Sequence, residues 1–179
     1  MLYAYGFERV GVVVSDLYLV DPTLPAGREG PERGVRLEIR MFEPGDAEGS
    51  LYRAFPITVG RPLWRADLLE SVFSVPGSLD RAHYHPRFNG WGPVDDVFTV
   101  ELTAAPLAWL EAKLTNPEDL LGEAGVAAHE VGPDDVADLR DSAPGIMATV
   151  RNLLDIASKG TRARPPDWQQ LDRARLSWL

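Results

Sequence analysis

The spacing of the hydrophobic residues changes near Thr103, and this change is the feature that most constrains the fold. In residues 35–42, VRLEIRMF, apolar and charged side chains alternate, which is typical of a strand with one buried and one solvated face. In residues 143–159, apolar side chains instead recur at helical spacing and form one stripe. Strands in the first part of a chain and helices in the second part predict an α+β fold.

The expected fold is one domain over residues 1–179, mainly β in 1–103 and mainly α in 104–179. We expect an antiparallel β-sheet in the N-terminal ~100 residues, with the helices of the C-terminal part packed on one face. Strands are predicted at 10–21, 35–42, 52–59, 81–88 and 96–102, with a long loop at 21–34. The segment 60–74 is ambiguous, and its apolar residues could form one side of a short helix. A last short amphipathic helix is predicted at 167–179.

Composition excludes several classes of function. The chain has no cysteine, which rules out disulfides, thiolate catalysis and Cys-ligated metal sites. Its net charge of −9 makes nucleic acid an unlikely partner over most of the surface. The first residues lack the pattern of a signal peptide, and no apolar run approaches the ~20 residues of a membrane span. We therefore expect a cytoplasmic protein with no membrane partner.

The stretch RAHYHPRFNGW, residues 81–91, is the strongest candidate for a site. If 81–88 is a strand, Ala82, Tyr84 and Phe88 lie on one face and suit the core. The nitrogen-bearing side chains then share the other face, and these are Arg81, His83, His85 and Arg87. The core does not require these four side chains, so they form either a site or an ordinary solvated surface of the sheet.

A hairpin with 96–102 predicts what stands opposite the two histidines. If Phe88 pairs with Asp96, His85 faces Thr99 and His83 faces Glu101. Two histidines two positions apart on a strand, with a carboxylate as third ligand, can hold a divalent metal ion. His83, His85 and Glu101 are accordingly the predicted metal ligands and the predicted catalytic residues, and His129 is the candidate fourth ligand.

The segment from Gly77 to His85 resembles the opening of the metal-binding motif of the cupin family, with a glycine, five residues and then His-x-His. The resemblance covers nine residues and implies that His83 and His85 bind a metal ion. The motif continues with a glutamate four or five positions further on, where this chain has Asn89 and Gly90. The chain is therefore not assigned to the family.

Other interpretations of the same residues remain open. Without a metal, His83 and His85 suit proton transfer on a phosphate ester, with Arg81 and Arg87 holding the anion. In a second place, Arg61, Trp64 and Arg65 suit a shelf for a small anionic or aromatic ligand, although a buried Trp64 fits as well.

A non-enzymatic interaction protein is the alternative class of function. Such a protein would use its sheet face or the helix at 167–179. This helix carries Trp168, Trp178 and Leu179, and these residues suit docking onto the body of the protein or onto a second copy in a homodimer.

Overall fold

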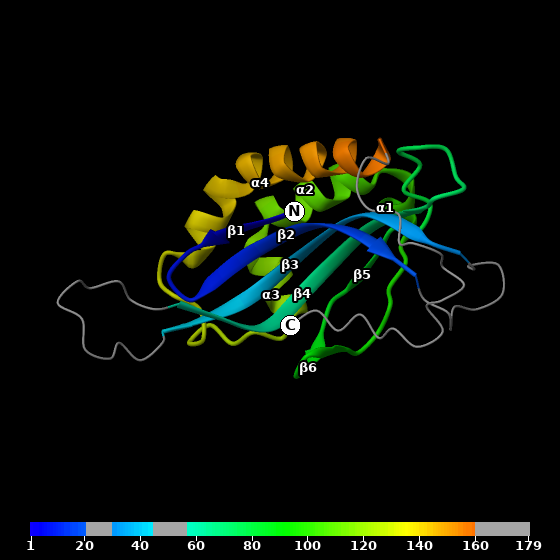
Figure 1. The fold of residues 1–179 in the computed structure, drawn as a ribbon. Coiled ribbons are helices and arrows are strands. Elements are labelled where there is room, and N and C mark those ends of the chain that lie inside the picture. Colours follow the sequence, from blue (N-terminus) through cyan, green and yellow to red (C-terminus); the bar gives the residue numbers. More distant parts are fainter. Residues whose placement is uncertain (21–29, 45–56, 160–179) are drawn as a thin grey trace.

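An antiparallel meander of five strands forms the N-terminal half of the fold in a computed structural model, which describes residues 1–20, 30–44 and 57–159. The strands are β1 (Leu2–Gly6), β2 (Val10–Leu19), β3 (Glu32–Pro44), β4 (Ile57–Ser71) and β5 (His83–His85). Their order in the sheet is the order in the sequence (Figure 1), so each strand pairs with the next. A two-stranded ribbon follows, made of β6 (Phe88–Asn89) and β7 (Gly92–Pro93).

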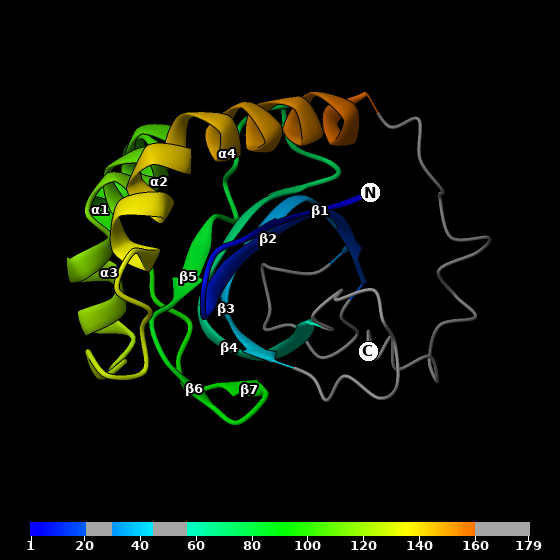
Figure 2. The same ribbon diagram turned by 90° about the vertical axis from the view of Figure 1, so that its left-hand side faces the viewer.

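Among the described residues, four helices follow the strands and cover one face of the curved sheet (Figure 2). They are α1 (Val100–Ala104), α2 (Pro106–Thr115), α3 (Pro117–Glu123) and α4 (Asp135–Ser158). The longest, α4, presents Leu139, Ile146 and Val150 to the core, and it packs on β2 and β3. The α+β fold with helices gathered on one face is confirmed.

Alternation along each strand separates the two faces of the sheet. The side chains toward the helices form the hydrophobic core, as Val12, Leu37 and Ala66 do at the centre of three neighbouring strands. The residues between them in sequence lie on the face away from the helices, and there the sheet carries charged side chains such as Arg36 and Asp67. This second face, called the open face below, holds the candidate site.

The helix predicted at 60–74 is wrong, because this segment lies almost wholly within the long strand β4. Trp64, Ala66 and Leu68 occupy the core face, and Arg65 and Asp67 between them occupy the open face. That alternation has the period of a strand. The irregularity at Pro62, where the pairing with β3 shifts, places Leu63 in the core as well and hides the alternation.

The strand predicted at 96–102 is also wrong. One isolated bridge pairs Val97 with Tyr84, and the chain enters α1 immediately afterwards. Thr99 is the N-cap of this helix, since its side chain accepts a hydrogen bond from the backbone N–H of Leu102 at 3.2 Å. The first helix therefore begins before the change in hydrophobic spacing near Thr103.

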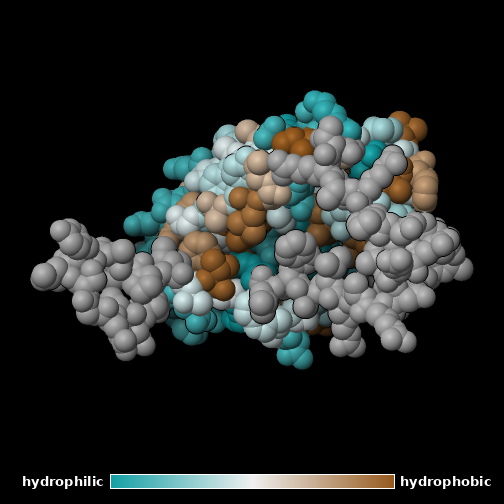
Figure 3. All heavy atoms as spheres, viewed as in Figure 1, coloured by the Kyte–Doolittle hydropathy of each residue, from teal (hydrophilic) through white to brown (hydrophobic). Residues whose placement is uncertain are grey.

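Three predicted segments lie partly or wholly outside the described residues. These are the loop at 21–29, the beginning of the strand at 52–59 and the helix at 167–179. No helix within the described ranges is long and apolar enough to cross a membrane. On the face seen in Figure 3, hydrophobic and hydrophilic residues of the described surface are interspersed. Leu2 on the edge strand β1 is among the exposed hydrophobic residues.

Candidate metal centre

Pairing between β4 and β5 brings three ligand-type side chains together on the open face. Asp67 pairs with His83, and Arg65 pairs with His85, in antiparallel register. Because residues opposite each other in a sheet point to the same side, Asp67 and both histidines converge, whereas Tyr84 between them turns into the core. Ligand atoms of Asp67, His83 and His85 all lie within 4.8 Å of one another.

All three side chains are buried, although they lie on the face away from the helices. Asp67 and His85 are each 1% exposed, and His83 is 7% exposed. The chain after β7 covers them, since the Phe98 ring lies 5.4 Å from that of His83 and Asp96 contacts His85. The interpretation of the two histidines as part of a solvated sheet face is therefore wrong.

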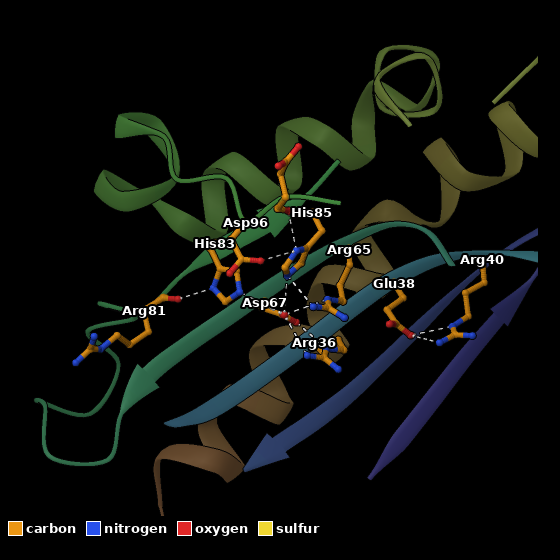
Figure 4. Close-up of polar contacts among 10 residues, drawn as sticks. Arg36, Glu38, Arg40, Arg65, Asp67, Arg81, His83, His85 and Asp96 are labelled. Atoms are coloured by element: carbon orange, nitrogen blue, oxygen red, sulfur yellow. Dashed lines mark hydrogen bonds and ion pairs between the residues drawn. The ribbon is translucent and has the colours of Figure 1, made fainter. Parts of the chain in front are cut away.

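Backbone carbonyl groups determine the orientation of both imidazole rings. Nδ1 of His83 lies 2.9 Å from the carbonyl oxygen of Arg81, and Nδ1 of His85 lies 2.9 Å from that of Asp95. A carbonyl oxygen only accepts hydrogen bonds, so each Nδ1 carries a hydrogen and donates it. In the neutral rings, the lone pair is then on Nε2. These Nε2 atoms lie 3.6 Å (His83) and 3.3 Å (His85) from Oδ2 of Asp67 (Figure 4).

Two arginines hold the carboxylate of Asp67. Arg36 on β3 forms a bidentate pair, with Nε 2.7 Å from Oδ1 and Nη2 3.1 Å from Oδ2. Arg65 places its Nε 3.0 Å from Oδ2. The Nη2 atom of Arg65 also lies 2.7 Å from Nε2 of His85. Because guanidinium only donates, this histidine accepts the bond and its Nε2 carries no hydrogen.

Protonation in this cluster favours the forms that bind metal ions. Burial acts to raise the pKa of Asp67, but the guanidinium groups of Arg36 and Arg65 outweigh it and hold this pKa far below its usual range. Burial lowers the pKa of His83, and the nearby Asp67 carboxylate offsets only part of that effect. At neutral pH, Asp67 is ionised and His83 is neutral.

Glu101 does not face the histidines. It lies in the first turn of α1 and is exposed, because the chain leaves the sheet after Val97. The register that placed Glu101 opposite His83 is therefore wrong, and His83 pairs with Asp67 of β4 instead. The sequence did not point to Asp67 because 60–74 resembled a helix. The alternation of Asp67 with the core residues Trp64, Ala66 and Leu68 is the pattern that would have placed it on the open face of a strand.

The arginines of the 81–88 segment serve other contacts. The side chain of Arg81 points away from Asp67 (Figure 4), with Nε 4.0 Å from Oε1 of Glu32, and the carbonyl group of Arg81 orients His83. Nε of Arg87 donates to the carbonyl oxygen of Glu123 at the end of α3. The predicted row of four side chains on one face therefore reduces to the two histidines.

Arg61, Trp64 and Arg65 do not form the predicted shelf, because their side chains lie in three different environments. Trp64 is fully buried in the core against Tyr84 and Trp109. Nη2 of Arg61 lies 3.2 Å from Oε1 of Glu130. Arg65 alone reaches the candidate centre.

His129, the candidate fourth ligand, is exposed in the segment between α3 and α4. Its carbonyl oxygen accepts a hydrogen bond from Arg9. His129 does not belong to the cluster of Asp67, His83 and His85.

A cavity of about 230 Å³ lies near the end of α4 and is separate from this cluster. Its lining includes Arg33 and Glu70, which form an ion pair with Nε 2.9 Å from Oε1, together with Leu107 and Leu154. None of the three clustered ligand residues lines it. The candidate centre thus depends on converging ligand atoms and not on the volume of this cavity.

No protein-family model, curated protein or solved structure matches this chain.

Proposed function

We propose that the protein binds one divalent transition-metal ion through Asp67, His83 and His85. The observation that carries this proposal is the orientation of the rings. Both Nδ1–H groups donate to backbone carbonyls, so the ligand lone pairs are on the Nε2 atoms, which lie 3.6 Å (His83) and 3.3 Å (His85) from the same carboxylate oxygen. Anchoring of one ring nitrogen by a carbonyl group is the usual arrangement behind a histidine that binds a metal ion through the other.

The chemistry of the ligands supports a first-row transition metal. Two imidazole nitrogens and one carboxylate oxygen are the donor set used for zinc and for iron, with positions left open for water or a substrate. Metal binding requires deprotonated ligands, and both Asp67 and His83 have this form at neutral pH. The three side chains are buried, so bulk water has little access to their ligand atoms.

Arg36 and Arg65 contact the atoms that the metal ion would bind. Arg36 approaches the carboxylate in the bidentate geometry, and Oδ2 is also the oxygen nearest to both histidines. Arg65 is bonded to Nε2 of His85, so binding of the ion requires the guanidinium to leave this nitrogen. The proposed centre is accordingly one in which a metal ion replaces an arginine cation.

Titration of chelator-treated full-length protein with Co²⁺ and Zn²⁺ tests the proposal. Calorimetry is expected to show about one ion per chain, and bound Co²⁺ is expected to give visible absorption typical of nitrogen and oxygen ligands. His83→Ala and His85→Ala are each expected to weaken binding by more than about 100-fold, because loss of a ligand exceeds the effect of losing an outer partner. His129→Ala is the matched control and is expected to bind normally.

A second measurement keeps the test independent of the stability of the variants. Long-range ¹H–¹⁵N spectra of the wild-type protein resolve the ring nitrogens of its three histidines. Addition of Zn²⁺ is expected to shift the Nε2 signals of His83 and His85 and to leave those of His129 in place. Absence of binding by the wild type, or equal loss of binding in His129→Ala, would overturn the proposal.

A further inference from the structure

Arg65 lies beside the proposed metal ion with part of its hydrogen-bonding capacity unused. It stands two positions before Asp67 on β4 and pairs with His85 on β5. Its side chain is 13% exposed and lies over the ring of Phe88, with 5.6 Å from Cζ to the ring centroid. Within the described residues, its polar contacts involve Nε and Nη2, and none involves Nη1.

Metal binding at His85 also frees Nη2 of Arg65. An unprotonated imidazole nitrogen has one lone pair, so Nε2 of His85 cannot bind a metal ion and accept a hydrogen bond from Arg65 at the same time. The guanidinium then has two of its nitrogens without a protein acceptor. Both belong to the terminal fork that binds oxyanions in bidentate geometry.

The charges of the buried groups favour an anion at this position. The guanidinium groups of Arg36 and Arg65 share the single carboxylate of Asp67, and their balance is therefore one positive charge. The next pair along the open face, Glu38 with Arg40, is neutral by itself at 2.7 Å. Asp96 near His85 is 55% exposed, so solvent screens its charge. A divalent ion adds two further positive charges.

We infer that the metal-loaded protein binds a small oxyanion, a carboxylate or a phosphate group, which contacts both the metal ion and the guanidinium of Arg65. This inference rests on the proposed metal centre and names the class of ligand that the centre takes. The three protein ligands leave coordination positions open for the oxyanion. Arg65 supplies the second point of attachment, because its side chain already reaches the ligand atom of His85.

Calorimetric titration with acetate and with methylphosphonate, in a buffer free of other oxyanions, tests the inference and distinguishes the two chemistries. The Co²⁺-loaded wild type is expected to bind at least one of them at least tenfold more tightly than the metal-free protein. Arg65→Gln is expected to lose at least tenfold in affinity, and Arg65→Lys to recover part of it, since lysine keeps the charge but lacks the fork. Arg40→Gln removes a paired arginine of the same face and is the matched control.

The order of the measurements separates the two proposals. Metal binding is measured first for each variant, and its absence in the wild type overturns the metal centre itself. If Co²⁺ binds and neither oxyanion binds the loaded wild type, or if Arg65→Gln binds the oxyanion as the wild type does, the role assigned to Arg65 is overturned. A loss of affinity in Arg40→Gln equal to that in Arg65→Gln also overturns it, because the effect would then reflect general charge.

Discussion

Nη2 of Arg65 and Nε2 of His85 lie 2.7 Å apart, so a guanidinium occupies the lone pair that a metal ion would use. The two residues are partners in the β4–β5 register, and both point to the open face. The same nitrogen of His85 lies 3.3 Å from Oδ2 of Asp67. It also places a cation in competition with the proposed metal ion.

Removal of this competition is expected to tighten metal binding. In Arg65→Gln, His85 no longer accepts a bond from a cation and the ion meets one positive charge fewer, so Co²⁺ affinity rises about tenfold, or about 1.4 kcal/mol. Calorimetry on the chelator-treated variant measures this change. Arg40→Gln, whose arginine pairs with Glu38, is expected to leave Co²⁺ affinity at the wild-type value. Weaker Co²⁺ binding by Arg65→Gln would contradict this competition.

Asp67 is expected to stabilise the fold whether or not a metal ion is bound. Asp67→Asn leaves Arg36 and Arg65 part-buried without their carboxylate, and loss of one partner from a buried ion pair costs about 3–5 kcal/mol. Urea unfolding of the metal-free protein measures the change in the free energy of unfolding. The exposed pair Glu118–Arg140 provides the comparison, since Glu118→Gln is expected to leave stability nearly unchanged. A small effect at Asp67 would show that the arginines find other acceptors.

Asp135 at the start of α4 connects this helix to the β1–β2 turn. Its buried carboxylate accepts backbone N–H bonds from Glu8 at 2.7 Å, Arg9 at 3.1 Å and Gly132 at 2.7 Å. Asp135→Ala leaves these donors without an acceptor and is expected to destabilise the protein by about 3 kcal/mol or more. Asp138→Ala, an exposed acid in the first turn of the same helix, is expected to cost less than about 1 kcal/mol. Equal unfolding midpoints for the two variants would refute this role.

Asp80 is expected to make stability depend on pH in the acid range. Burial acts to raise its pKa, but hydrogen bonds from Ser74, from the backbone of Ser71 and from Ser78 outweigh it and lower the pKa below its usual value of 3.8. A lowered pKa contributes stability above pH 3.8, and this contribution is lost as the pH falls through the folded-state pKa.

Comparison with Asp80→Asn measures that contribution. At pH 7 the variant is expected to be less stable by about 0.5–1 kcal/mol, a range reduced for solvent screening at this part-exposed position. Unfolding by urea at several values between pH 7 and pH 2 is expected to show the difference shrinking below about pH 4. A difference that stays constant with pH would mean that the ionised carboxylate is not the stabilising form.

Much of the fold follows from local patterns in the sequence. Alternation in residues 35–42 places Val35, Leu37 and Ile39 in the core as predicted, and the apolar stripe of 143–159 lies within α4. The predictions that failed concern 60–74 and 96–102. There a proline-associated irregularity and a helix cap at Thr99 interrupt the pattern, and local periodicity does not show which partner a strand takes.

By itself, the sequence determined that His83 and His85 share one strand face, because side chains two positions apart on a strand point the same way. Only the tertiary structure decided what stands opposite them. The pairing of β5 with β4 brings Asp67, Arg65 and, through β3, Arg36 to the histidines, while Glu101 leaves with α1. The physical reason is that strand pairing depends on register and on burial of Tyr84 and Ala66 on the core face. These contacts join residues distant in the chain, and no local pattern encodes them.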